Sequence, residues 1–221
     1  MTGDLDPCLF VPALPTLEDR DWEKLEAALV TAPALPLGQA WRPSPEETFR
    51  PGVVRLGWHE GKIVVAAKLE DQNVFTRATT HNQRLWELGD VFEMFFRNAA
   101  REDYLEVHAA PGDQRLQFHF PSRETVAGLR SGIGRLEDFV VQEPLFDFRT
   151  RRTSDGWVVV AEIPGLALGF NVSSLKGEAV LASFSRYDYA SDGSPPVLSS
   201  TSPHRQLDFH RQEEWMRLVF C

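Results

Sequence analysis

Cysteine and, relative to acidic residues, lysine and arginine are scarce in this 221-residue chain, and each shortage argues against particular properties of the protein. There are only two cysteines, Cys8 and Cys221, one near each end of the chain. Chain ends often lie close together, so a bridge between them is conceivable, but we expect two free thiols. Lysine and arginine number 23 against 32 aspartates and glutamates, which gives a net charge of −9. Because phosphate binding needs a basic surface, this charge argues against a nucleic-acid partner.

Long apolar runs are also missing. The N-terminal segment MTGDLDPCLFVPALP lacks a basic start, and Pro12 and Pro15 interrupt its longest apolar stretch. No stretch is long enough to span a membrane. We therefore expect no signal peptide, no membrane partner and a cytoplasmic location. The hydrophobic content of 43% and the charged content of 25% are ordinary for a globular protein, and the length fits one large β domain or two small ones.

Helical periodicity is confined to one N-terminal segment. Thr16 opens a pattern that resembles a capping box, and the following DWEKLEAALV repeats apolar residues on one face. Pro33 and Pro36 end this helix. Residues 31–52 are rich in proline and predict an extended arm laid across the domain.

From Val53 onward the chain reads as short strands separated by turn residues. Many short strands with little helix predict one β-sandwich or barrel, and one further helical turn is expected between Pro164 and Leu175. The predicted strands are residues 53–58, 62–70, 91–97, 104–109, 115–120, 139–142, 145–149, 157–163, 178–187 and 215–220.

Alternation within three of these strands, residues 91–97, 104–109 and 115–120, predicts a sheet with two different faces. Side chains of a strand alternate between its faces, and hairpin spacing suggests that these strands are neighbours. One face is apolar, and the other carries carboxylates, imidazoles and an amide together with aromatic rings. The apolar set is Phe92, Met94, Phe96, Leu105, Val107, Ala109, Leu116, Phe118 and Phe120, and the polar set is Val91, Glu93, Phe95, Arg97, Tyr104, Glu106, His108, Arg115, Gln117 and His119.

The pair Glu93 and Glu106 admits an enzymatic interpretation. Paired carboxylates serve as general acid and base in glycoside hydrolysis. A solvated sheet face with carboxylates near Arg97 and Arg115 explains the same residues without catalysis.

Other site chemistries find little support. The six histidines show no tight metal-binding spacing. Met94 with a histidine could ligate haem, but Met94 belongs to the apolar face of its strand. The glycine-rich residues 128–134 lack the flanking strand and helix of a dinucleotide-binding loop and predict a turn. We therefore expect no cofactor.

Two long polar stretches end in aromatic residues. Residues 71–90 contain Trp86, and residues 188–208 lead into Phe209 and His210. A structureless connection of this length is often a binding loop. A sugar ring stacks its apolar face on an aromatic ring, and its hydroxyls pair with carboxylates, amides and guanidinium groups. Burial in a core is the competing explanation for each aromatic residue.

The order of these motifs resembles the family 9 carbohydrate-binding modules over nearly the whole chain, from about Pro12 to the C-terminus. The resemblance rests on KIVVAAKLED, RLWELGDVFEMFF, YLEVHAAPGD, GWVVVAEIP, LASFSRYDY and DFHRQEEWMRLVF, in this order. It implies an immunoglobulin-like sandwich of antiparallel sheets that stacks a sugar between two aromatic rings. It also gives Asp90 a structural role, places Trp215 in the core, and allows structural calcium near Asp71.

The sequence thus predicts an all-β fold, an immunoglobulin-like or jelly-roll-type antiparallel β-sandwich, as a single domain over residues 1–221. The short helix and the proline-rich arm of residues 1–52 pack on it. The predicted function is non-catalytic binding of a carbohydrate or a similar small polar ligand. The alternatives are a glycoside-active enzyme, a haem-binding relative and a protein-interaction sandwich. The candidate binding residues are Trp86, Glu93, Glu106, His108, Arg186, Phe209 and His210.

Overall fold

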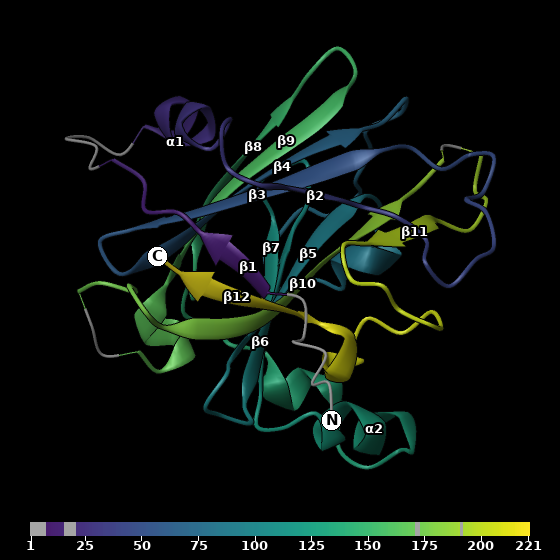
Figure 1. Ribbon diagram of the computed structural model, residues 1–221. Helices are drawn as coiled ribbons and strands as arrows, with labels where there is room; N and C mark the ends of the chain where they lie inside the picture. Colours follow the sequence, from purple (N-terminus) through teal and green to yellow (C-terminus); the bar gives the residue numbers. More distant parts are fainter. Residues whose placement is uncertain (1–7, 16–20, 171–172, 191) are drawn as a thin grey trace.

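Two β-sheets pack face to face in the computed structural model, which describes residues 8–15, 21–170, 173–190 and 192–221 (Figure 1). The larger sheet has the order β1-β12-β10-β5-β6-β7, with β11 beside β10, and the smaller has the order β2-β3-β4-β9-β8. The larger sheet consists of β1 (Cys8–Val11), β5 (Val91–Asn98), β6 (Tyr104–Ala109), β7 (Arg115–Phe120), β10 (Ala179–Asp188), β11 (Val197–Ser200) and β12 (Met216–Phe220). The smaller sheet consists of β2 (Ala34–Pro36), β3 (Gly52–His59), β4 (Lys62–Glu70), β8 (Asp147–Arg152) and β9 (Gly156–Pro164).

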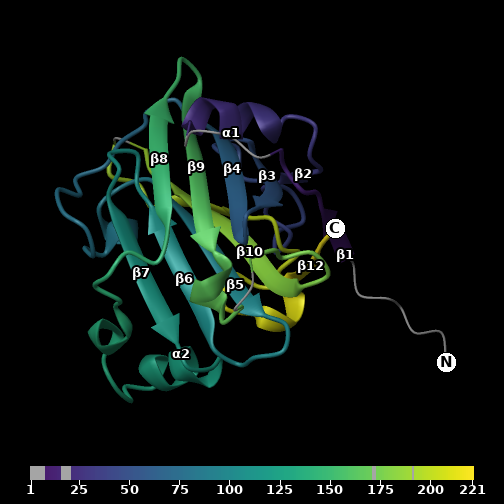
Figure 2. The ribbon, with the colours of Figure 1, turned by 90° about the vertical axis from the view of Figure 1, so that its left-hand side faces the viewer.

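Helices are short and lie outside the two sheets (Figure 2). The α-helices are α1 (Trp22–Ala28) and α2 (Glu124–Arg130), and the 3-10 turns are η1 (Leu85–Glu87), η2 (Leu136–Phe139), η3 (Gly165–Leu168) and η4 (Gln212–Glu214). Asp21 caps α1, because its Oδ1 accepts hydrogen bonds from the backbone N–H groups of Glu23 and Lys24. The predicted Thr16 cap lies outside the described residues. Among the helices that are described, none is both long and apolar enough to cross a bilayer.

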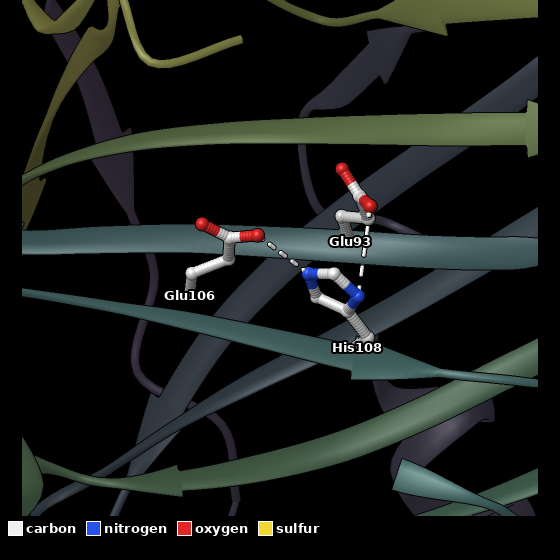
Figure 3. A group of neighbouring side chains, drawn as sticks. All are labelled: Glu93, Glu106 and His108. Carbon is white, nitrogen blue, oxygen red and sulfur yellow. Dashed lines mark hydrogen bonds and ion pairs between the residues drawn. The ribbon is translucent and has the colours of Figure 1, made fainter. Parts of the chain in front are cut away.

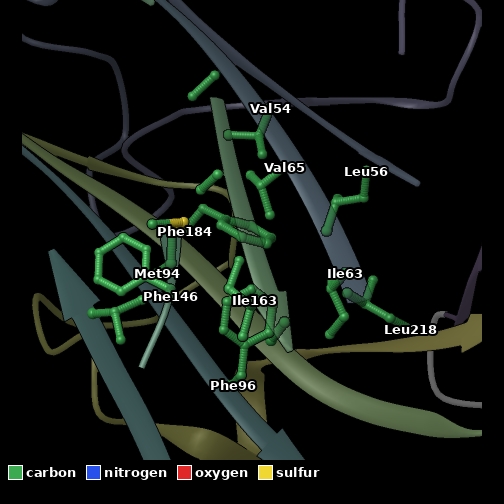
Figure 4. Packing of buried hydrophobic residues seen from close by; sticks show 14 of the residues in the cluster. Val54, Leu56, Ile63, Val65, Met94, Phe96, Phe146, Ile163, Phe184 and Leu218 are labelled. Atoms are coloured by element: carbon green, nitrogen blue, oxygen red, sulfur yellow. The ribbon is translucent and has the colours of Figure 1, made fainter. Parts of the chain in front are cut away.

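The main core fills the space between the sheets. It contains the inward residues of β5 and β10, such as Met94, Phe96 and Phe184, opposite Val65 and Ile163 of the smaller sheet (Figure 4). Burial of these aliphatic and aromatic side chains, at about 25 cal/mol per Å² of apolar surface, drives the two sheets together. The predicted apolar face of β5 and β6 is confirmed, and so is the mostly β sandwich fold.

A second apolar cluster lies on the outer face of the larger sheet, and here the predicted facing of β7 is wrong. The register pairs Glu106 with Phe118, so Leu116, Phe118 and Phe120 share the outer face with Glu106. Gln117 points to the opposite side, where its amide donates to the carbonyls of Val141 and Glu143 and its Oε1 accepts from the N–H of Leu145. This reversal is possible because β7 is an edge strand, whose inner side is covered by a loop.

Most predicted strands are confirmed, with small shifts at their ends. Residues 139–142 do not form the predicted strand, because only Val140 makes an isolated bridge, to Phe118. The short strands β1, β2 and β11 were not predicted, although β2 lies in the expected proline-rich arm. The larger sheet also departs from purely antiparallel order, since β1 and β12 are parallel. Cys8 and Cys221 are free and exposed, as expected.

A buried ionic cluster anchors the two long loops to the sandwich. The Arg186 Nη2 atom lies 3.2 Å from Asp71 Oδ2 and 3.0 Å from Asp188 Oδ1, and its Nη1 donates to the Glu70 carbonyl. Asp71 begins the first loop and Asp188 begins the second. Because the Arg186 side chain is only 1% exposed, its charge depends on these carboxylates for compensation.

Asp90 completes this cluster and has the structural role that the motif resemblance implied. Its Oδ2 accepts a hydrogen bond from the Phe75 N–H at 2.5 Å, and its Oδ1 accepts one from the Tyr189 N–H at 2.8 Å. Burial, followed by the charge of Asp71, raises the pKa of Asp90 to about 7. Burial also raises the pKa of Asp188 to about 6, although Arg186 opposes this shift.

Replacing Arg186 with methionine should lower the free energy of unfolding at pH 7 by about 3–5 kcal/mol, because it leaves buried carboxylates without a counter-charge. The loss should be smaller at pH 5, where Asp90 and Asp188 take up protons and no longer need compensation. Urea denaturation at both pH values measures the effect.

Arg151→Met is the matched control, because the pair of Arg151 with Glu26 is half exposed and should contribute less than about 1 kcal/mol. An Arg186→Met variant that unfolds like the control would show that the cluster does not anchor the loops.

Candidate ligand-binding site

A pocket of about 440 Å³ opens over the outer face of the larger sheet. The two long loops and the segment around α2 form its walls, and β5, β6 and β7 form its floor. Its lining residues are Trp86, Glu93, Glu106, Phe118, Phe120, Val126, Leu129, Arg130, Leu136, Tyr187, Leu198, Leu207, Asp208, Phe209 and His210. Aromatic walls around a few polar groups are typical of small-molecule sites.

Trp86 stands in one wall of the pocket, within the 3-10 turn η1. Its ring is half-buried and meets the rings of His108 and Phe118 at centroid distances of 5.7 and 6.3 Å. The Tyr189 hydroxyl donates to the Trp86 carbonyl, which ties one loop to the other. Gly89 closes the turn at φ 145°, where an added Cβ would lie 2.5 Å from the Phe75 carbonyl oxygen. Trp86 is thus held in place while part of its ring faces the pocket.

Two carboxylates, those of Glu93 and Glu106, form the polar part of the floor. Both lie beside the imidazole of His108 (Figure 3). The His108 Nε2 lies 2.8 Å from Glu106 Oε1, and its Nδ1 lies 3.5 Å from Glu93 Oε1. The ring therefore bridges a residue of its own strand and one of the neighbouring strand β5. Glu106 Oε2 is buried and has no hydrogen-bond partner within the described residues. Its nearest charged neighbour, His210 Nε2, lies 3.7 Å away, beyond hydrogen-bond distance. A buried acceptor without a hydrogen bond beside a pocket favours a ligand that donates one.

The three groups shift one another's protonation. Burial raises the pKa of Glu93 to about 7, although the charge of His108 opposes the shift. Burial alone would lower the pKa of His108, but Glu93 and Glu106 together raise it. Burial likewise pushes the pKa of Glu106 upward, but His210 and His108 hold it below its usual range. Glu106 is therefore the permanent anion of the floor, and Glu93 gains or loses a proton near neutral pH.

Phe209 and His210 form the wall that follows the second long loop. Phe209 is 6% exposed, and its ring packs against Trp41 and Phe95. The Nδ1 of His210 lies 3.0 Å from the Tyr104 hydroxyl, and its Nε2 lies 3.7 Å from Glu106 Oε2. Phe209 reaches the pocket with only a small part of its ring, whereas His210 faces the free oxygen of Glu106.

The structure brings most of the candidate residues together. Trp86, Glu93, Glu106, Phe209 and His210 line the same pocket. His108 is fully buried behind the lining, where it holds the two carboxylates.

Arg186, which was also among the candidate binding residues, does not line this pocket. It pairs with Phe92 across β10 and β5 and therefore faces the interior side of the sheet. Trp215 is buried beneath the pocket, as predicted for a core residue, and its indole N–H donates to the Phe209 carbonyl.

One wall was not predicted at all. The helix α2 contributes Val126, Leu129 and Arg130, and η2 contributes Leu136. The sequence ETVAGLR carries a helical i, i+3 pair at Val126 and Leu129, but seven residues are too few for a clear periodic signal. Arg130 donates two hydrogen bonds of 2.9 Å to Asp208, which connects this wall with the second loop.

Among the described residues, two groups of side chains have the composition of a metal site, and neither suits a metal ion well. Ligand atoms of Glu93, Glu106 and His108 lie within 4.8 Å of one another, but each His108 nitrogen already faces a carboxylate. The aspartates of the loop-anchoring cluster are equally close, but the Arg186 guanidinium occupies the place of a cation between Asp71 and Asp188. These residues therefore do not fit the calcium that the family resemblance allowed.

Haem ligation by Met94 finds no geometric support. Met94 is fully buried between the sheets, on the opposite side of β5 from Glu93 and the pocket. A haem iron at the pocket could not reach its sulfur atom.

No protein-family profile matches the sequence, and no curated protein does. Solved structures do match along nearly the whole chain. A candidate carbohydrate-binding protein from Bacteroides uniformis aligns with a TM-score of 0.73 and 16% identity, over 98% of this chain and 100% of its own.

Two family 9 carbohydrate-binding modules from Caldicellulosiruptor kristjanssonii align as well. The one in complex with cellotriose has a TM-score of 0.64 and 14% identity, over 96% of this chain and 93% of its own. The one in complex with glucose has a TM-score of 0.58 and 12% identity, over 97% and 95%. The resemblance seen in the sequence motifs is confirmed as a resemblance of fold: this chain has the β-sandwich fold of the family 9 carbohydrate-binding modules.

Proposed function

We propose that the protein binds a carbohydrate or a similar polyol in the pocket beside Trp86, without transforming it. The observation that carries the proposal is the meeting of the half-buried Trp86 ring with the carboxylates of Glu93 and Glu106 in one pocket. A sugar offers an apolar ring face to the indole and hydroxyl donors to the carboxylates. Charge-assisted hydrogen bonds to a buried carboxylate are about twice as strong as neutral ones.

Support also comes from the solved structures with the same fold. Two of them hold glucose or cellotriose. Their identity to this chain is low, so these sugars serve here as the first probes, followed by a glycan array.

Binding is favoured over glycoside hydrolysis by the arrangement of the two carboxylates. Both carboxylates lie beside His108 and are engaged with its ring as charge partners. A glycosidase instead uses its two carboxyl groups as acid and as base or nucleophile toward the substrate. Turnover of an aryl glycoside panel that disappears in Glu93→Gln would reverse this preference.

Trp86→Ala should weaken the binding of glucose or cellotriose at least tenfold, because the stacking surface is lost. It should lower the free energy of unfolding by less than about 2 kcal/mol, against about 3–5 kcal/mol for a fully buried ring. Isothermal titration calorimetry and urea denaturation measure the two quantities.

Trp22→Ala is the matched control, because Trp22 is also half-buried but lies on α1, against the smaller sheet. Equal affinities of Trp86→Ala and the natural protein would refute the stacking role. A stability loss as large as that of a core tryptophan would show that Trp86 is structural.

Affinity should depend on pH through Glu93. Its pKa is raised to about 7, so it is ionised above pH 7 and protonated below. An ionised carboxylate is the stronger acceptor for a sugar hydroxyl, so affinity should fall as the pH decreases, by at most about tenfold per unit.

Glu93→Gln should bind more weakly at pH 8 and show a flatter profile between pH 6 and 8. Calorimetric titrations at three pH values test this expectation. A profile that persists unchanged in Glu93→Gln would assign the dependence to another group.

A further inference from the structure

The pocket has an apolar side that the binding of hydroxyl groups does not use. Val126, Leu129 and Leu136 come from the α2 wall, Leu198 comes from β11, and Leu207 comes from the loop that follows β11. None of these side chains donates or accepts a hydrogen bond. They line the same pocket as Glu93 and Glu106. The carboxylates can accept hydrogen bonds from a ligand, whereas these apolar side chains can only pack against it.

The charged groups on this side are already engaged with each other. Arg130 donates two hydrogen bonds of 2.9 Å to Asp208, in a bidentate pair. Such pairs are geometrically specific and strong. A ligand hydroxyl placed here would have to compete with the Arg130–Asp208 pair or remain without a partner.

A fully hydroxylated ligand therefore fits only part of the pocket. A hydroxyl that is moved from water to an apolar wall without a partner costs about 1–3 kcal/mol. A methylene or aromatic group against the same wall is stabilised, by about 0.8 kcal/mol per buried methylene. The two effects have the same direction and favour an apolar group on this side.

The apolar wall is also held in place, so that it can select a ligand by shape. The Arg130–Asp208 pair ties α2 to the second loop, and Arg84 donates a 2.7 Å hydrogen bond to Glu137 of η2. The Phe139 ring at the end of η2 packs on Phe120 of the floor at 5.4 Å. A wall that is fixed before binding requires less ordering on binding.

We propose that the natural ligand is a sugar or similar polyol that carries an apolar substituent, and that Leu129 and Leu136 of the α2 wall select this substituent. The hydroxyl groups bind to Glu106 and Glu93, and the substituent packs against the leucines. This inference rests on the proposed function, because it assigns a second contact region within the same pocket.

Matched pairs of glycosides test the inference. Methyl and phenyl β-glycosides of glucose, galactose and mannose are titrated into the natural protein by calorimetry. For the sugar that binds, the phenyl glycoside should bind at least about tenfold more tightly than the methyl glycoside, because its ring buries more apolar surface.

Leu129→Asn should reduce this ratio to less than about threefold, because the phenyl ring loses its apolar contact. Leu129 is half-buried, so the variant should fold, and Leu136→Asn provides the same test from η2. Leu166→Asn is the matched control, since Leu166 on η3 is 73% exposed and does not line the pocket.

The outcomes separate the two proposals. Equal affinity for the methyl and phenyl glycosides would overturn the selection of a substituent and leave sugar binding intact. A phenyl preference that survives in both Leu129→Asn and Leu136→Asn would also overturn it, because the selectivity would then lie elsewhere. If no glycoside of either kind binds, the proposed function fails and the inference fails with it.

Discussion

A single buried guanidinium, that of Arg186, connects the sandwich with both loops that wall the pocket. It lies between Asp71 at the start of one loop and Asp188 at the start of the other. Asp90 continues the connection through hydrogen bonds from both loops, and the Tyr189 hydroxyl bonds to the backbone of Trp86. The position of the Trp86 ring therefore depends on an ion pair that does not touch the ligand site. Long loops with little regular structure can hold a pocket open in this way because their ends are fixed by charge.

The two faces of the larger sheet have different environments. Its inner face packs against the smaller sheet, and its outer face is covered by loops and α2, which leave a pocket above Glu93 and Glu106. Carboxylates on a covered face are costly unless they are compensated. His108 compensates both of them with one ring, which explains why a fully buried histidine lies where a solvent-facing residue was expected.

Strand alternation predicted much of this arrangement and failed where the strand environment changed. In β5 and β6 both neighbours of each strand are other strands, so the apolar residues face the core as the pattern indicates. In β7 the apolar residues Phe118 and Phe120 face the pocket instead, and Gln117 points to the other side, where it bonds to the backbone of residues 141–145. Arg186 shares the inner face with Phe184, as its position along the strand indicates, but the motif resemblance had suggested it as a binding residue. The helix α2 was not predicted because it is short. Its N-cap residue is Arg123, whose side chain makes no capping hydrogen bond.

The glutamine at position 117 has a consequence for the edge of the larger sheet. An exposed edge strand offers unpaired backbone groups to a second chain. Beside β7, however, the N–H of Val141 donates to the Gln117 carbonyl, and the Gln117 side chain makes three further hydrogen bonds to the backbone of residues 141–145. One amide side chain thus fastens an irregular segment along the margin of the sheet. The segment shields that margin from strand addition, as an extra strand would, without extending the sheet.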